Sequence, residues 1–168
     1  MRVLAIAALC ASFAVPILGQ SIPRTGGTLL SGQPFVLPND LTTSKTILIV
    51  GFSEKSAASS TEWGKQTRNM LAAVPSLASY QLPVLASVPR FIRSIVVGSM
   101  KKDVPPDLRG TFLPIFENES KWKQVVEFSA PDDAYVLLVD AHGSVLWRTH
   151  GAPTGERLKQ LREAVARK

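Results

Sequence analysis

The sequence predicts an α/β fold with a mixed central β-sheet flanked by helices, and three observations predict it. Two nearly continuous apolar runs rich in β-branched residues, at 46–52 and 135–139, are typical of strands buried on both faces. Apolar residues at helical spacing follow the first run in two successive segments. A tight turn at 140–143 follows the second run and predicts a β-hairpin ahead of a closing helix. Two strand–helix units joined to an antiparallel hairpin give a mixed sheet.

The amino-terminal residues 1–20 have the pattern of a secretory signal peptide. Arg2 supplies a positive start, residues 3–15 are apolar, Pro16 ends the run, and small residues follow it. A membrane anchor is the alternative. The segment 3–19, however, has only 17 residues and contains a proline, which places it at the short limit of roughly 17–25 for a span. We therefore expect an exported protein, periplasmic or extracellular.

The single cysteine, Cys10, lies inside this segment. Removal of the signal peptide leaves a chain without cysteine, so the exported protein has no disulfide bond and depends on its packed core. Residues 21–31 are rich in small and polar residues and predict an extended lead-in, with a short extended piece at 28–30. The domain itself is assigned to residues 32–168.

The first half of the domain alternates extended and helical segments. Residues 33–38 form a proline-bounded extended segment suited to a sheet edge. After the first buried strand, Ser59 to Glu62 has the spacing of a capping box and predicts the start of a helix that runs to Pro75. The next strand is expected at 82–87. Pro89 then opens a second amphipathic helix with interspersed Arg and Lys.

The second half starts with a long proline-containing connection at 103–114 and a short helix capped by Asn118. A turn at 129–133 leads to the second buried strand, and residues 144–148 pair back against that strand. Thr154 caps a final helix with one apolar face.

This order of elements resembles the thioredoxin fold in the form used by exported thioredoxin-like and peroxiredoxin-like proteins. Residues 33–38 resemble the segment before the first core strand, and 46–52 the strand that delivers the active-site loop. Residues 136–145 resemble the hairpin of strand, Asp, turn, Gly and strand, and 150–154 the start of the last helix. These motifs mark the fold and say little about chemistry.

The sequence departs from redox-active relatives at their working site. In those proteins a Cys-x-x-Cys motif follows the first core strand and opens the next helix, where the thiolate drives exchange. The two matching positions here are Ala57 and Ser60, and the position of the relatives' cis-proline falls near Ala134. Because neither matching position is a cysteine, thiol–disulfide exchange and cysteine-based peroxide reduction are excluded for the mature chain.

A narrower resemblance concerns a thioredoxin-like family of mitochondrial ATP-synthase assembly factors with bacterial relatives, which also lacks the cysteine pair. Residues 52–56, 133–140 and 143–151 are similar to that family's pattern. The resemblance implies a non-catalytic role in the assembly of another protein, without a cofactor.

The leading hypothesis is a redox-inactive module that binds a protein or peptide through the segments 53–60 and 131–135. The first helix, with Lys55 near its amino terminus, can hold a carboxylate or phosphate. An exposed Trp63 would suit an extended peptide. The expected contact residues are Ser53, Lys55, Ser56, Ala57, Ser60, Trp63, Ala134 and Tyr135.

The alternative is a hydrolase or metal-dependent enzyme that uses a loop serine such as Ser56 with Asp140, His142 and His150. A serine nucleophile needs a base, and these are the only histidines. The structural explanation is simpler, because serines form turns and Asp140 belongs to a tight turn. A metal site needs three or four converging ligands, so we expect none. A third option is a member of the fold with a purely structural role.

The charge balance gives little further guidance. The sequence contains nineteen Lys and Arg and thirteen Asp and Glu, so its formal net charge is +6. The basic residues spread over the middle of the chain and the last helix, which also carries Glu156 and Glu163. We expect a solvated surface, with an anionic membrane surface as a further partner. Nucleic acid is not expected, because the sequence has no recognition motif.

Overall fold

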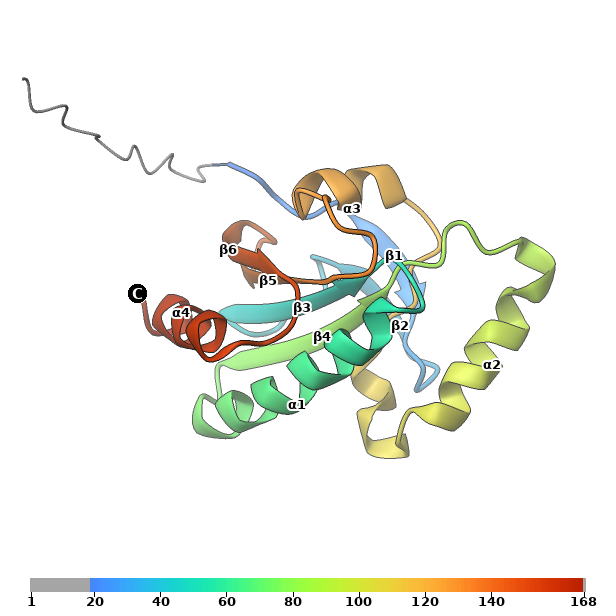
Figure 1. Cartoon of the computed structure of the whole chain (residues 1–168). Coiled ribbons are helices and arrows are strands. Elements are labelled where there is room, and N and C mark those ends of the chain that lie inside the picture. Colours follow the sequence, from blue (N-terminus) through green and yellow to red (C-terminus); the bar gives the residue numbers. More distant parts are fainter. Residues whose placement is uncertain (1–18, 168) are drawn as a thin grey trace, which may run out of the picture.

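The computed structural model describes residues 19–167 and confirms the predicted α/β class (Figure 1). The central sheet has the strand order β4-β3-β5-β6. Strand β3 is parallel to β4 and antiparallel to β5, and β5 is antiparallel to β6, so the sheet is mixed as predicted. The strands are β3 (Lys45–Gly51), β4 (Leu77–Pro83), β5 (Ala134–Asp140) and β6 (Val145–His150).

Helices cover both faces of this sheet, and a small hairpin joins them on one face. The helices are α1 (Ser56–Ala73), α2 (Arg93–Asp103), α3 (Glu119–Val125) and α4 (Gly155–Ala166), with short 3-10 segments η1 (Arg90–Ile92) and η2 (Pro106–Thr111). The hairpin is β1 (Thr25–Thr28) and β2 (Pro34–Leu37). The segment predicted for a sheet edge therefore pairs within its own two-stranded sheet.

The core consists of two apolar layers separated by the sheet, because alternate residues of each strand point to opposite faces. In β3, Ile47 and Ile49 pack with residues of α1 and α4, whereas Leu48 and Val50 pack with α3 and the β1–β2 hairpin. All five residues from Thr46 to Val50 are buried, which confirms the prediction from their continuous apolar run.

The predicted lead-in is part of the packed domain. Its strand lies at Thr25–Thr28 rather than at 28–30, and Ile22 and Leu29 are buried in the core. Gln20, predicted as the last signal residue, is also attached, because its carbonyl accepts a hydrogen bond from the Val145 N–H at 2.8 Å. Residues 1–18 of the predicted signal peptide, Cys10 included, lie outside the described residues.

Two predicted boundaries in the first strand–helix–strand unit are wrong. Helix α1 begins at Ser56, so Ser59 lies inside the helix and makes no capping box with Glu62. Strand β4 occupies 77–83 instead of 82–87, because it starts directly after the α1 carboxyl terminus and pairs Leu77 with Lys45 of β3. Pro83, which lacks an N–H, ends the strand.

Of the two helix caps predicted in the second half of the domain, one forms and the other does not. Thr154 caps α4 as predicted, since its hydroxyl accepts from the Arg157 N–H. Asn118 precedes α3 in a left-handed conformation, with φ of 59°. Its side chain donates to the Arg24 carbonyl at 3.1 Å and does not cap the helix.

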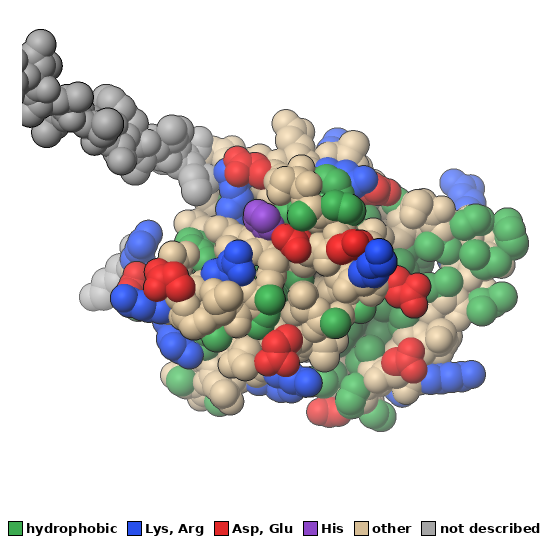
Figure 2. All heavy atoms as spheres, in the orientation of Figure 1, with side chains coloured by type: hydrophobic (Ala, Val, Ile, Leu, Met, Phe, Trp, Pro, Cys, Tyr) green, Lys and Arg blue, Asp and Glu red, His purple; other side chains and the backbone are tan. Residues whose placement is uncertain are grey.

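Helix α2 forms where predicted, but its apolar residues do not join the core. None of its eleven residues, all within the described part of the chain, is buried. Phe91 is 81% exposed and Ile95 is 69% exposed. Helix α2 stands apart from the sheet in Figure 1, and hydrophobic side chains gather over it at the right of Figure 2. Among the helices of residues 19–167, none combines the length and apolarity needed to cross a bilayer.

Candidate functional site

The candidate site lies where β3 ends and β5 begins. Gly51, the last residue of β3, pairs in register with Ala134, the first residue of β5. The β3–α1 loop (52–55) and the pre-β5 turn (129–133) therefore meet at one edge of the sheet. These are the two segments in which the sequence predicted a contact surface.

Asp132 connects the loop and the turn. Its carboxylate accepts a hydrogen bond from Ser53 Oγ at 3.0 Å and lies 3.5 Å from Lys55 Nζ. Ser53 Oγ also accepts from the Ser56 N–H at 3.2 Å, at the first turn of α1. Lys55, predicted to attract an external carboxylate or phosphate, is thus already paired with an anion of the chain itself.

Ser56 and Ser60 are buried beneath the loop. Ser56 Oγ donates to the Ser53 carbonyl at 2.7 Å. A Cβ atom added at Gly51 would lie 2.5 Å from Ser56 Oγ and 3.4 Å from Ser60 Oγ, so the absence of a side chain at Gly51 lets α1 approach β3. Of the two positions matched to the thiols of redox proteins, Ala57 faces solvent and Ser60 is buried. Ser56 and Ser60 therefore serve the packing of α1 and are not contact residues.

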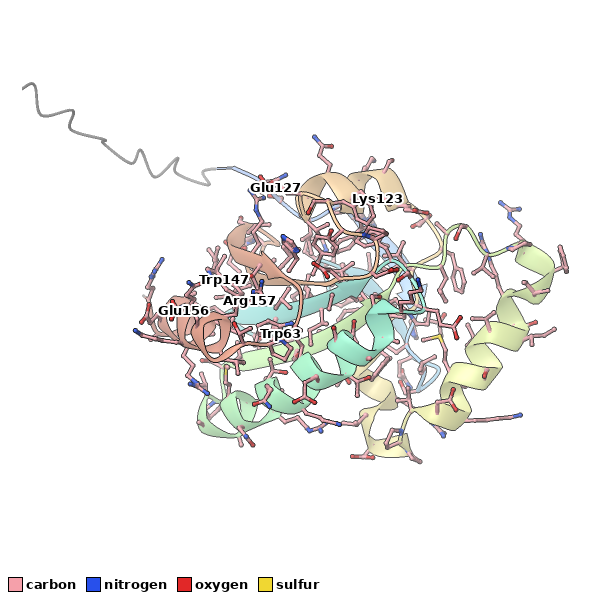
Figure 3. All side chains as sticks on the ribbon, in the orientation of Figure 1. Trp63, Lys123, Glu127, Trp147, Glu156 and Arg157 are labelled. Atoms are coloured by element: carbon pink, nitrogen blue, oxygen red, sulfur yellow. The ribbon has the colours of Figure 1, made fainter. Side chains whose placement is uncertain are left out.

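Trp63 is not an exposed aromatic residue, which corrects the prediction. Its side chain is fully buried, and its Nε1 donates to the Gly151 carbonyl at 2.8 Å. Figure 3 shows Trp63 between α1 and the neighbouring elements of the core. The cause is helical spacing, because Trp63 shares the inner face of α1 with Thr67 and Met70, which are also buried.

Ala134 and Tyr135 are also buried and support the site from below. The Tyr135 hydroxyl accepts from the N–H groups of Ser129 and Ala130, both at 2.8 Å, and donates to the Ala130 carbonyl at 3.0 Å. Tyr135 thereby fixes the pre-β5 turn. The predicted contact residues that remain accessible are Ser53, Lys55 and Ala57.

An aromatic cluster under the turn was missed by the sequence analysis. The Phe52 and Phe128 rings meet edge to face with centroids 5.1 Å apart, and both contact Tyr135. Lys123 Nζ lies 4.8 Å from the Phe128 ring centroid, and Lys123 is labelled on α3 in Figure 3. No local sequence pattern predicts this cluster, because its members come from four separate elements or loops.

The residues of the enzyme alternative are not brought together. His142 and Asp140 lie at the hairpin turn, whereas His150 pairs in register with Tyr135 at the other end of β5. Strands rise about 3.3 Å per residue, so roughly 20 Å separates the two histidines. Within residues 19–167, no hydrogen bond joins a serine of the 53–60 segment to a histidine, and no group of three or more metal-ligating side chains occurs.

His150 does form a close pair, but with Asp133 of the pre-β5 turn and not with Asp140 or a loop serine. His150 Nδ1 lies 2.6 Å from Asp133 Oδ2, and the His150 ring stacks on Tyr135 with centroids 5.4 Å apart. Asp132 and Asp133 are neighbours in the turn but have different partners. Asp133 pairs with His150, whereas Asp132 accepts a hydrogen bond from Ser53 and pairs with Lys55. The His150–Asp133 pair joins the end of β6 to the pre-β5 turn.

Asp140 has a structural role in the hairpin. Its carboxylate accepts from the N–H groups of His142 at 2.9 Å and Ser144 at 2.8 Å. Partial burial, the largest single influence, raises the pKa of Asp140. The hydrogen bonds from Ser144 and His142, together with the His142 charge, outweigh it and leave the pKa below its ordinary value. These contacts hold the tight turn as the sequence predicted.

Comparison with known proteins identifies the fold. No protein family model and no curated protein matches this sequence. Among solved structures, the exposed lipoprotein thioredoxin Etrx1 of Streptococcus pneumoniae is similar, with a TM-score of 0.58 and 8% identity over 84% of this chain and 98% of its own. A thiol-disulfide oxidoreductase from Bacteroides fragilis has a TM-score of 0.55 and 12% identity, over 87% and 99%. The chain has a thioredoxin-like fold.

A third similar structure is BsSco, described as a member of the Sco family of cytochrome c oxidase assembly proteins. It has a TM-score of 0.58 and 10% identity, and the match covers 90% of this chain and 96% of BsSco. At such identities the likeness concerns the thioredoxin-like fold alone. The resemblance to ATP-synthase assembly factors therefore stays a prediction.

Proposed function

We propose that this chain is an exported, redox-inactive thioredoxin-like domain that binds a protein or peptide and assists the assembly of an envelope complex. One observation carries the proposal. The thioredoxin-like fold is retained, yet the positions matched to the thiols hold Ala57 and Ser60, and the sequence has no cysteine after Cys10. A scaffold without its sulfur chemistry is most useful as a recognition surface.

The accessible part of the site suits recognition. Ser53, Lys55, Ala57 and Asp132 combine a hydroxyl, a cation, a methyl group and a carboxylate on one surface that buried residues hold in place. The Lys55–Asp132 pair is solvent-exposed, and pairs of this kind contribute only about 0–1 kcal/mol. A partner can therefore take over either charge at small cost.

Two likenesses support an assembly role over other kinds of binding. The sequence resembles assembly factors that also lack the cysteine pair, and BsSco is described as belonging to a family of assembly proteins. Neither likeness identifies a partner. The proposed partner is a polypeptide of the envelope, recognised by the loop and not by a cofactor.

Export is supported by the pattern of residues 1–20 and by the likeness to Etrx1, an exposed lipoprotein. The structure suggests where processing would stop. The Gln20 carbonyl accepts from Val145, its side-chain oxygen accepts from Arg148 at 2.5 Å, and its amide donates to the Gln124 carbonyl. We propose that Gln20 stays on the mature chain. Its intact mass checks this, and a chain that starts at Ser21 or later contradicts it.

Site-specific photocrosslinking tests the function. A photoreactive amino acid replaces Ala57 in the full chain, expressed in a host that exports it, and a second variant carries it at Ala73. Ala73 is a matched control, because it is also an exposed alanine of α1 but lies at the opposite end of the helix. The proposal predicts a defined crosslinked polypeptide from position 57 and none from position 73. Identical products from both positions, or none from either, contradict it.

A further inference from the structure

Helix α2 presents an apolar surface that the domain does not use. Within residues 19–167 the exposed large hydrophobic side chains are Phe91, Ile95 and Leu146, and the first two are the most exposed. Both lie on the η1–α2 segment, over which hydrophobic side chains gather in Figure 2. Such a helix is usually covered by another element or partner.

Cations flank the apolar residues along this segment, and one of them lies on the same face. Phe91 and Ile95 are four residues apart, and Lys102 follows Ile95 by seven, so all three share one face. Arg90 precedes Phe91 directly. Residues 90–103 carry four cations and the single carboxylate of Asp103, a net charge of 4 − 1 = +3. The final helix α4, residues 155–166, carries three cations and two carboxylates, a net charge of only 3 − 2 = +1.

Arg93 attaches α2 to the domain and leaves the other cations to solvent. Its Nε donates to the Val88 carbonyl at 2.9 Å, its Nη2 donates to the Ala86 carbonyl, and its guanidinium lies 4.7 Å from the Phe116 ring centroid. Arg90, Lys101 and Lys102 make no ion pair within residues 19–167. The helix is thus held in place while its apolar and basic face stays available.

We propose that α2 docks on an anionic lipid surface, with Phe91 and Ile95 inserted at the headgroup level and the basic residues against the headgroups. Large apolar side chains such as Phe91, next to a flank rich in Lys and Arg, are typical of interfacial helices. This surface is separate from the β3–α1 loop, so the inference does not depend on the proposed partner.

The area of the patch favours lipid over a second copy of the chain or another protein. A phenylalanine and an isoleucine together offer on the order of 300 Å² of apolar surface. A stable protein interface buries about 800 Å² on each partner, of which somewhat more than half is apolar. Insertion into a lipid interface needs no such area, because the cations add long-range attraction to the anionic headgroups.

Vesicle cosedimentation tests the inference with the full chain as an exporting host delivers it. The vesicles are phosphatidylcholine alone, or equal parts of phosphatidylcholine and phosphatidylglycerol. The variants are Phe91→Ser/Ile95→Ser, Lys101→Glu/Lys102→Glu and the control Leu146→Ser, which alters an exposed leucine on β6. Since every variant keeps residues 1–18 or is processed alike, differences between variants report on α2 alone.

The wild type and Leu146→Ser should bind the phosphatidylglycerol vesicles about tenfold better than phosphatidylcholine alone, and added salt should weaken this binding. Both double variants should bind the phosphatidylglycerol vesicles about tenfold more weakly than the wild type. Their thermal unfolding should be unchanged, because the altered side chains are not buried. Equal binding by all variants, or no preference for the anionic lipid, overturns the inference. A concentration-dependent dimer that Phe91→Ser/Ile95→Ser abolishes also overturns it, in favour of a second copy.

Discussion

Helices α1 and α2 each follow a strand of the parallel pair, and both have apolar residues at helical spacing, but they pack differently. Helix α1 buries Trp63, Thr67 and Met70 against the sheet, whereas α2 buries none of its residues. The opposite face of the sheet is covered by α3 and the β1–β2 hairpin, so no sheet surface is left for α2. Helical periodicity thus shows that an apolar face exists, and topology decides what covers it.

The largest expected effect is at Trp63. Replacement by alanine removes a fully buried indole and its hydrogen bond to Gly151, so Trp63→Ala should lower the free energy of unfolding by about 3–5 kcal/mol. Phe91→Ala truncates an aromatic side chain in η1, directly before α2, and should change the free energy of unfolding by less than about 0.5 kcal/mol. Urea unfolding of both variants checks the comparison. A loss at Phe91 as large as that at Trp63 would show that α2 belongs to the core.

Gly51→Ala tests how closely α1 approaches β3. The new Cβ would lie 2.5 Å from Ser56 Oγ, so the variant should be destabilised by about 1–3 kcal/mol. In the Gly51→Ala/Ser56→Ala double variant the clashing hydroxyl is gone. A double-mutant cycle should therefore show that Ser56→Ala lowers the free energy of unfolding less in the Gly51→Ala variant than in the wild type. Strict additivity would indicate that the two residues do not touch.

Arg93→Ala should loosen α2 without unfolding the domain. The variant loses hydrogen bonds to the Val88 and Ala86 carbonyls, worth about 1 kcal/mol together with the contact to Phe116. Amide hydrogen exchange should rise in residues 93–103 and stay unchanged in α1. Arg90→Ala is the matched control, and we expect no change there. Faster exchange throughout the chain would mean that α2 is an integral part of the fold.

The smallest effect is expected at the start of α1. Asp132→Asn keeps the side-chain shape but removes the charge that faces Lys55, so stability should fall by about 0.5 kcal/mol or less. High salt should reduce this difference further. Thermal unfolding at low and high salt measures it. A loss of several kcal/mol would show that the loop is part of the core and not a surface that a partner can rearrange.

Sequence reasoning succeeded where a signal was local and strong. The runs 46–52 and 135–139 are nearly continuous apolar runs of strand length, and both form buried strands. The turn at Asp140 correctly predicts the hairpin. Sequence reasoning failed where contacts between distant segments determine which residues are buried. The α1 start was predicted four residues late, with Ser59 in place of Lys55 as the N-cap, and this concealed that Ser56, Ser60 and Trp63 share one inner face. The aromatic cluster of Phe52, Phe128 and Tyr135 requires knowledge of which loops meet.

The central claim is that the edge formed by the β3–α1 loop and the pre-β5 turn recognises a polypeptide without cysteine chemistry. Crosslinking from position 57 of the exported chain, with position 73 as the control, tests it most directly. We predict a defined crosslinked polypeptide from position 57 of a mature chain whose mass shows that Cys10 has been removed. A product that forms only from chains that still contain Cys10, or that forms equally from position 73, would contradict the claim.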